Sequence, residues 1–463
     1  MTRLSAATLD RVPSRVRRPG YDRTRVRAGV VHLGLGAFHR AHQALVFDDA
    51  LAAGDHGWGV VGVSMRSAAM RDRLVPQDKL YTVIVENHSE REARVVGALL
   101  DILVAPEEPA RVIEAIADPG VHLVTLTITE KGYHASRSES AAGLIAAGLF
   151  LRRQRNLPGL TVMSCDNLPN NGERLRAAVS KSVGTANSGL ADWIAMSVTF
   201  PSTMVDRIVP ATTGADIARW QVEGGFEDQA LVRTEPFSQW VVEDRFAGPM
   251  PDLGALGVTL TADVRPWEQA KLRLLNGAHS AMAYLGGLAG LTTVDDFVRA
   301  PFGEPFLRSL WDESAPTVTR APRLDLTHYC NRLLERFGNP ALEHRLAQIA
   351  IDGSQKIPQR IVAPLLERLA TGAEATALGL ALAAWMRWQQ GVNDLGRAFT
   401  VDDPLAELIS PVAGDAAALL GLEQIFPPEA RTNPALVKLV SYHLRQLETL
   451  GARGAIEAML THS

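Results

Sequence analysis

The most restrictive feature of the sequence is the order strand, glycine pair, helix and strand near its start. The segment "GVVHLGLGAFHRAHQ", residues 29–43, puts an apolar β-branched run directly before two glycines and a helical pattern, and a second such run, "WGVVGVS", begins at Trp58. That order is a βαβ unit, whose two strands run parallel. The unbroken apolar runs "VHLVTLTI" from Val121 and "LTVMSCD" from Leu160 are typical of a parallel sheet buried on both faces. The first part of the chain therefore predicts an α/β domain.

The pattern changes after about Val264. The segment "RPWEQAKLRLLNGAHSAMAYLGGLAG" begins a series of helix-length stretches, and strand signals almost vanish. A chain of 463 residues is also too long for one ordinary core. We predict an α/β Rossmann-type N-terminal domain, residues 1–264, followed by a mostly α-helical C-terminal domain, residues 265–463.

The glycine pair between the first strand and its helix predicts a dinucleotide-binding loop. Gly34 allows a tight turn, and Gly36 allows the backbone to approach a pyrophosphate closely. His39 stands where the third glycine of that pattern serves helix–strand packing, so we expect a variant geometry. A plain structural turn is the alternative. The predicted cofactor-binding residues are Gly34, Gly36, Ala37, Phe38, His39 and Arg40.

Two ambiguities surround this loop. His39 and His42 lie one helical turn apart, but no acidic or cysteine partner completes a metal site, so we favour a helix-surface or anion-binding role and expect no metal. The acidic residue that binds an NAD ribose is missing after the second strand, where Arg66 stands nearby. Arg66 suits either a 2′-phosphate or packing beside adenine, which leaves NAD and NADP open.

A second constellation lies in "AKLRLLNGAHS". On an α-helix Lys271, Asn276 and His279 span an arc of roughly 140°, which still allows all three to face one cleft. Hydride transfer from a carbinol carbon needs a base for the hydroxyl proton, a role that a lysine fills when burial lowers its pKa. Asn276 and His279 would donate hydrogen bonds to the oxygen. The alternative is a solvated lysine, a helix-ending Asn-Gly and a packed histidine.

Other polar groups follow apolar strands or share a helix face. "SCDNLPNNG" places Asp166, Asn167 and Asn171 at the carboxyl end of a strand, where open α/β sheets bind ligands. Asp206 lies in the apolar setting of "VTFPSTMVDRIVP", where a structural ion pair is the alternative to a functional role.

Two cations share one helix face in the second half of the chain. Lys356 and Arg360 stand at i and i+4 in "DGSQKIPQR". They repel one another unless an anion lies between them, as a substrate carboxylate would, while a plain surface position is the alternative.

Composition limits the partners. A net charge of −4 gives no strong field for nucleic acid or an anionic membrane, and no apolar run approaches the roughly 18 residues of a membrane span. The first residues lack a secretory apolar segment, and the two cysteines, Cys165 and Cys330, fit packing in a reducing compartment. We expect a cytoplasmic protein, monomeric or a small homo-oligomer, that binds small molecules and neither nucleic acid nor membrane.

Together these segments, with "TITEKGY" and "RFGNPALEHRLAQIAIDGSQKIPQR", resemble the mannitol dehydrogenase family of zinc-independent polyol dehydrogenases, which includes fructuronate and tagaturonate reductases. The resemblance covers nearly the whole chain. It implies that residues 34–40 form a true cofactor loop and that the active site lies between the two domains. It also implies that Lys271 is the general acid/base, that Asn167, Asn276 and His279 bind the reacting oxygen, and that Asp206 orients the site.

Within the family, the motifs resemble the fructuronate reductase branch. Lys131 in "TEKGY" adds a cation that suits a sugar-acid carboxylate together with Lys356 and Arg360, whereas a neutral polyol gives it no partner. Ser238 departs from the arginine common in that branch. The resemblance implies reduction of D-fructuronate to D-mannonate with NAD as cofactor. Mannitol or another polyol or sugar acid is the alternative substrate, and a non-catalytic nucleotide sensor is the remote alternative.

Overall fold

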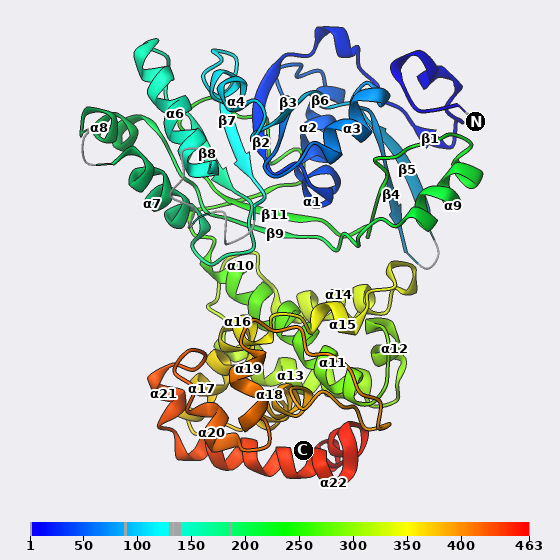
Figure 1. Ribbon diagram of the computed structural model, residues 1–463, viewed down its shortest axis with the longest axis vertical. Coiled ribbons are helices and arrows are strands. Elements are labelled where there is room, and N and C mark those ends of the chain that lie inside the picture. Colours follow the sequence, from blue (N-terminus) through cyan, green and yellow to red (C-terminus); the bar gives the residue numbers. More distant parts are fainter. Residues whose placement is uncertain (1, 88–89, 129–132, 134–139, 185–187, 463) are drawn as a thin grey trace. The chain divides into compact units, whose positions relative to one another are not determined.

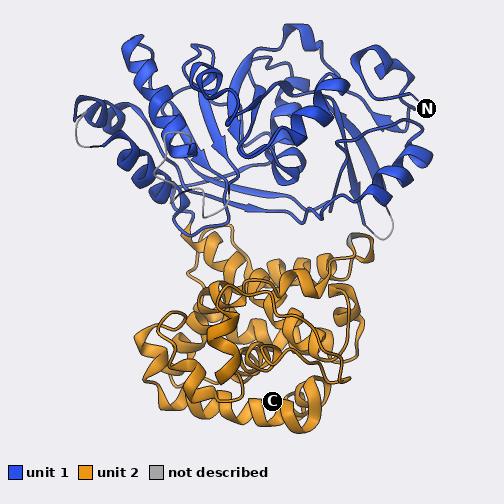
Figure 2. Cartoon of the chain, viewed as in Figure 1, with its two compact units in different colours: residues 1–264 blue, residues 265–463 orange. Residues whose placement is uncertain are grey.

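The computed structural model describes residues 2–87, 90–128, 133, 140–184 and 188–462. The chain divides into two compact units, residues 1–264 and 265–463 (Figure 2). Within the described residues, the first unit contains the named strands and the second is helical (Figure 1). The predicted fold class, a Rossmann-type α/β domain followed by a helical domain, is therefore confirmed. No helix of the described chain is both long enough and apolar enough to cross a membrane.

The main sheet of the first unit has five strands, and all neighbouring pairs are parallel. In spatial order they are β6 (Leu99–Val104), β3 (Gly59–Ser64), β2 (Ala28–Leu33), β7 (Leu123–Leu126) and β8 (Thr161–Ser164). The chain runs outward from β2 through β3 to β6 and then returns to the other side of β2 with β7. The switch point of the sheet thus lies between β2 and β7, where open α/β sheets bind ligands at the carboxyl ends of their strands.

Both faces of this sheet are buried, as the unbroken apolar runs predict. Val30 of β2 packs into a core with Phe47 and Leu51 of α2, while the next residue, Val31, packs into a second core with Leu144. The helices of this unit are α1 (Ala37–Ala41), α2 (Gln43–Ala52), α3 (Ala69–Leu74), α4 (Pro109–Ile116), α6 (Ala141–Gln154), α7 (Asn171–Val183), α8 (Ser188–Ser197) and α9 (Gly214–Gly224), with short 3₁₀ turns at Ala6–Arg11, Arg23–Arg25 and Val75–Gln77.

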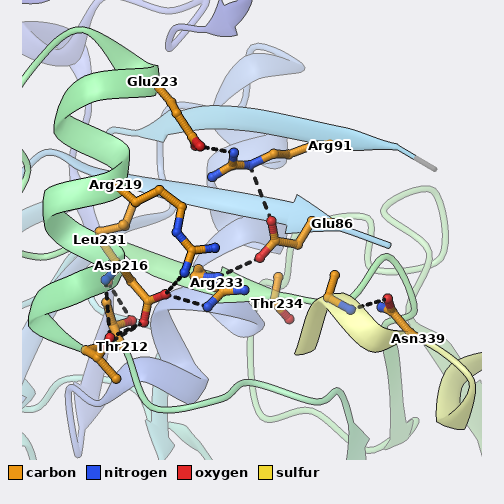
Figure 3. A network of polar contacts seen from close by, with 12 residues as sticks. Glu86, Arg91, Thr212, Asp216, Arg219, Glu223, Leu231, Arg233, Thr234 and Asn339 are labelled. Carbon is orange, nitrogen blue, oxygen red and sulfur yellow. Dashed lines mark hydrogen bonds and ion pairs between the residues drawn. The ribbon is translucent and has the colours of Figure 1, made fainter. Parts of the chain in front are cut away.

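Two smaller sheets complete the first unit. One has the order β1 (Val16–Arg17), β5 (Arg91–Val96), β4 (Tyr81–Glu86) and β10 (Val232–Thr234), and the other has the order β12 (Thr259–Thr261), β11 (Gln239–Glu243) and β9 (Thr203–Asp206). An ion-pair network fastens the four-stranded sheet to α9 (Figure 3). Arg233 of β10 donates to Glu86 of β4 at 2.6 Å and to Asp216 of α9 at 2.6 Å. All three side chains are largely buried.

The second unit packs around α11 and α18, which are buried on nearly every side. A helix that is apolar all round belongs in a core, and both of these contribute to one large cluster. The elements are α10 (Arg265–Ala270), a π-helical segment (Lys271–Asn276), α11 (Gly277–Leu288), α12 (Val294–Arg299), α13 (Gly303–Ser314), α14 (Leu326–Phe337), α15 (Leu346–Ile349), α16 (Gly353–Ile357), a second π-helical segment (Pro358–Val362), α17 (Ala363–Ala370), α18 (Thr376–Trp388), α19 (Ala406–Ile409), α20 (Ala416–Leu420), α21 (Pro428–Arg431) and α22 (Pro434–His462, broken at Gly451), with 3₁₀ turns at Ala315–Thr317, Pro340–Leu342 and Ser410–Val412.

Candidate functional site

The loop after β2 requires its first glycine. Gly34 has φ +103°, and a Cβ on it would lie 2.0 Å from the carbonyl oxygen of Thr127. The Thr127 hydroxyl donates a hydrogen bond to the Gly34 carbonyl at 2.8 Å, and the Gly34 amide donates to Val63 at 2.9 Å. The turn is therefore fixed at the switch point between β2 and β7.

The second glycine has a different environment. Gly36 is exposed at the start of α1 with φ −98°, and the nearest atom to a Cβ built there is the Gly34 oxygen at 3.8 Å. No described neighbour within the protein thus demands a glycine at this position. A bare backbone next to open space is what close approach of a pyrophosphate needs, so this loop fits a dinucleotide.

His39, in the place of the third glycine, packs inward. Its ring stacks on that of His32 in β2, with centroids 3.4 Å apart and planes 12° apart. The His32 ring nitrogens lie 2.8 Å from the Thr125 hydroxyl and 2.9 Å from the Thr127 hydroxyl. Burial lowers the pKa of His32 to about 3 and lowers that of His39 well below its ordinary value. Two neutral rings therefore join α1 to β2.

The expected helix-surface position of the two histidines is wrong, whereas the cofactor contact of His39 stays a prediction. His39 is fully buried and His42 is 1% exposed. The backbone at His42 leaves the helical conformation and separates α1 from α2, and its ring stacks on Phe38 with centroids 5.1 Å apart. Within the described residues no group of three metal-binding side chains is present.

Arg40, predicted to contact the cofactor, is used inside the fold. Its guanidinium is buried, donates to the carbonyl of Ala230 and lies over the Tyr81 ring, 5.3 Å from its centroid. Burial lowers the pKa of Arg40. A buried cation needs such partners, so this side chain supports the loop from behind. Arg66, by contrast, is exposed just after β3 and stays a predicted adenosine-side contact.

The carboxyl edge of the sheet carries the predicted cluster after β8. Asp166 is buried and accepts hydrogen bonds from the Tyr133 hydroxyl, the Ser164 hydroxyl and the Ile128 amide. Burial raises the pKa of Asp166 to about 7, and these hydrogen bonds act in the opposite direction. Asp166 therefore joins the segments that follow β7 and β8.

The two asparagines of this cluster have different surroundings. Asn171 is buried and donates to the carbonyl oxygens of Asp166 at 3.0 Å and Thr203 at 2.8 Å. Asn167 is exposed. Asp206 is buried as the last residue of β9, opposite Gln239 of β11. Asn171 thus holds the edge together, whereas Asn167 stays the predicted substrate contact.

Lys271 and Asn276 lie at the two ends of a π-helical segment, and both are buried. The predicted arc of roughly 140° for Lys271, Asn276 and His279 assumed α-helical spacing. It does not hold, because a π-helix forms i→i+5 bonds and widens the turn. The Asn-Gly pair at 276–277 does not end the helix, since α11 continues through it. Single π turns inside α-helices occur frequently at functional sites. The local backbone is therefore specialised where the candidate acid/base stands.

His279 completes this group on α11. It is 6% exposed, and its ring packs 4.7 Å from Phe337 and 5.0 Å from His344, measured between centroids. Burial lowers the pKa of His279 well below its ordinary value, and the charges of nearby cations add to the effect. Two buried atoms, the His279 Nε2 and the Asn276 Nδ2, have no hydrogen-bond partner among the described residues. Buried polar atoms are normally satisfied, so both suit a ligand.

The two cations after α15 are half-buried. The Lys356 ammonium donates to the carbonyl of Ile351, and Arg360 donates to the Ser280 hydroxyl at 3.1 Å. Burial, followed by the charge of Arg360, lowers the pKa of Lys356 to about 8, and burial lowers that of Arg360 to about 10. Arg360 lies in the second π-helical segment. Lys131, the third predicted carboxylate contact, lies outside the described residues.

Sequence reasoning missed three polar residues at these places. His32 interrupts an apolar strand, a signal that would have found it. Tyr133 belongs to the quoted "TEKGY" motif, whose lysine alone drew attention. His344 gives no spacing signal, because it meets His279 only through the packing of distant segments.

Comparisons with known proteins identify the family of this chain. The model of the mannitol dehydrogenase Rossmann domain matches residues 28–254, and that of the mannitol dehydrogenase C-terminal domain matches residues 263–448. The chain belongs to the mannitol dehydrogenase family. The resemblance seen in the motifs is thus confirmed, and with it the assignment to a family of oxidoreductases.

Members of the family with different substrates are similarly related. The chain is 38% identical to the D-mannonate oxidoreductase of Escherichia coli strain K12, covering 96% of this chain and 98% of that one. It is 37% identical to a mannitol 2-dehydrogenase of Pyrenophora tritici-repentis, covering 95% and 83%. The mannitol 2-dehydrogenase of Pseudomonas fluorescens, solved with NAD and D-mannitol, superposes with a TM-score of 0.91 at 34% identity over the full length of both chains.

Proposed function

We propose that this family member is an NAD-dependent reductase that converts D-fructuronate to D-mannonate reversibly. The observation that carries the proposal is the buried group Lys271, Asn276 and His279, in which two polar atoms of the last two residues are left for a ligand. A ketone oxygen that gains negative charge as it is reduced needs such donors, and one proton source.

Lys271, Asn276 and His279 have different roles in this reaction. Bound NADH would supply the hydride. The Lys271 ammonium gives its proton to the oxygen that becomes the alcohol, and in the oxidation direction the neutral amine takes it back. The amide of Asn276 and the neutral imidazole of His279, protonated at Nε2, donate hydrogen bonds to that oxygen. A neutral His279 beside Lys271 also avoids like-charge repulsion at the site.

NAD is supported by the loop at Gly34 and Gly36 and by the NAD complex of the Pseudomonas fluorescens relative. Gly34 shapes the turn and Gly36 leaves room for the pyrophosphate. We assign Phe38 and Ala37 to the same contact surface and Arg66 to the adenosine side. NADP is the alternative cofactor, because the exposed Arg66 follows β3 without a carboxylate at its end.

A sugar acid is supported by the half-buried cations Lys356 and Arg360 and by Lys131 in the sequence. Paired cations match a carboxylate and have no partner on a neutral polyol. The relative that acts on D-mannonate is 38% identical. Mannitol and D-fructose are the second candidate pair, favoured by the mannitol 2-dehydrogenase at 37% identity and by Ser238 in place of an arginine.

The decisive experiment follows absorbance at 340 nm with purified protein and NADH or NADPH, with D-fructuronate, D-tagaturonate and D-fructose offered separately. Oxidation of NADH by D-fructuronate, with little by D-fructose, is expected. Turnover of D-fructose alone would make the protein a polyol dehydrogenase and remove the proposed carboxylate role. Binding of NADH without turnover of any sugar would support the nucleotide-sensor alternative instead.

A further inference from the structure

The carboxyl edge of the main sheet holds a buried carboxylate to which the proposed reaction gives no chemical task. The side chain of Asp166 accepts from the Ile128 amide at 2.5 Å and from the Ser164 hydroxyl at 3.1 Å, in addition to the Tyr133 hydroxyl. Burying a carboxylate costs free energy that only its hydrogen bonds offset, so the loss of one donor destabilises the fold. Asp166 is therefore expected to have a role at this edge of the sheet that outweighs the cost of its burial.

The three donors come from two segments of the chain. Ile128 and Tyr133 follow β7, whereas Ser164 ends β8. The residue before Ile128 is Thr127, whose hydroxyl holds the carbonyl of Gly34 at 2.8 Å. One carboxylate thus fastens the segment after β8 to the segment that already fixes the glycine turn at the switch point.

The residue that follows Asp166 is Asn167, the exposed asparagine proposed to bind the reacting oxygen. On the other side of the carboxylate, Asn171 donates to the Asp166 carbonyl at 3.0 Å and also accepts from the Thr203 amide at 2.9 Å. The backbone at Asp166 is therefore held through both its side chain and its carbonyl, while the side chain of Asn167 is exposed. Such an arrangement fixes the backbone position from which the side chain of Asn167 extends.

We propose that Asp166 and Tyr133 are positioning residues that hold Asn167 in place for the substrate oxygen. This inference rests on the proposed function, since it deepens the part given there to Asn167. Neither residue touches the reacting atoms. Loss of the tether displaces Asn167 and weakens productive substrate binding, and displacements near 1 Å are enough to slow a reaction strongly.

The variants Tyr133→Phe and Asp166→Asn test the tether, because each removes one partner and nearly preserves shape. Tyr21→Phe is the matched control: Tyr21 is also half-buried and donates to a buried carboxylate, Asp48, at 2.6 Å, but lies away from this edge. We expect both test variants to lower kcat/KM for the sugar at least about tenfold, while the Kd for NADH stays within about twofold. The double variant should be no worse than the poorer single one, as for two halves of one contact.

A second readout is independent of turnover. Amide hydrogen exchange of peptides that cover residues 123–128 and 160–171, measured well below the unfolding temperature, should be faster in Tyr133→Phe than in Tyr21→Phe. Equal kcat/KM in these two variants, or equal exchange, overturns the tether. An equal loss of NADH affinity overturns the specific role at Asn167. If the wild type reduces no sugar, the proposed function fails, and exchange alone then decides whether the tether exists.

Discussion

The carbonyl oxygen of Thr127 lies 2.0 Å from the point that a Cβ on Gly34 would occupy, whereas a Cβ on Gly36 would meet nothing closer than 3.8 Å. The fold itself thus requires a glycine at position 34, whereas at position 36 a glycine is needed only if a ligand approaches the backbone. Gly34→Ala should destabilise the loop, because it adds both a clash and a strained φ.

Gly36→Ala should keep the unfolding temperature of the wild type and weaken NADH binding at least about tenfold, since the methyl group occupies the approach to the pyrophosphate.

The control for the Gly34 variant is Gly54→Ala. Gly54 also has a positive φ, +98°, but nothing lies within 4 Å of its Cβ position, so it reports the backbone cost alone, about 1–3 kcal/mol. Thermal unfolding and NADH fluorescence titration measure both quantities. Wild-type NADH affinity in Gly36→Ala would show that no ligand approaches this backbone.

Lys271→Ala should lower turnover about 10²- to 10⁴-fold, the usual worth of a positioned acid or base. The affinity for NADH should stay within about twofold, because the lysine acts on the sugar oxygen. The measurement combines steady-state rates with NADH titration. Lys438→Ala, which removes an exposed lysine of α22, is the control and should leave both unchanged. Turnover above a tenth of the wild-type rate in Lys271→Ala would exclude it as the general acid.

Lys356→Gln should raise the KM for D-fructuronate about tenfold or more and leave the weak reaction with D-fructose unchanged. The reason is that a hydrogen bond between charged groups contributes about 1.5–3 kcal/mol, and only the sugar acid offers a carboxylate. The comparison of the two substrates is an internal control, and Lys438→Gln controls for net charge. Equal effects on both sugars would assign Lys356 to the fold, through its bond to Ile351.

The sheet was predictable because its signal is local and redundant. Unbroken apolar runs at β2, β3, β7 and β8 indicate strands that are buried on both faces. The position of Gly34 directly after such a run indicates a tight turn. The interior of the loop was not predictable. His39 and Arg40 carry polar side chains, which sequence arguments place in solvent, yet His39 stacks on His32 of the preceding strand and Arg40 donates to the carbonyl of Ala230, far away in the sequence.

The candidate active site was predictable as a set of residues and not as a geometry. Lys271, Asn276 and His279 stand in one short segment, but its π-helical turn depends on packing that no periodicity reveals. Contacts across long sequence separations, such as His279 with His344 or Asp166 with Tyr133, need the fold itself. Which side chains are left without partners is likewise visible only in three dimensions.

Arg233 provides a test of stability, separate from function. Arg233→Met removes the cation that the buried carboxylates of Glu86 and Asp216 share, while Arg91 stays 3.3 Å from Glu86 and Arg219 stays 3.5 Å from Asp216. Because breaking a buried pair completely costs about 3–5 kcal/mol, we expect a loss near the lower end of that range. Arg308→Met is the control, because its partner Glu304 and Arg308 are both about half exposed and such pairs contribute at most about 1 kcal/mol. Urea unfolding at neutral pH, followed by tryptophan fluorescence, measures the difference.

The same network sets an acid dependence. Burial acts to raise the pKa of Asp216, but hydrogen bonds with Thr213 and the charge of Arg233 outweigh it and lower the pKa overall. A carboxyl whose folded pKa is lowered stabilises the fold above its ordinary pKa of about 3.9, and that stability is lost as the pH falls through the folded value. The wild type should therefore lose stability steeply below about pH 4. Arg233→Met should show a shallower acid slope, and an unchanged slope would mean that Arg233 does not hold the Asp216 charge.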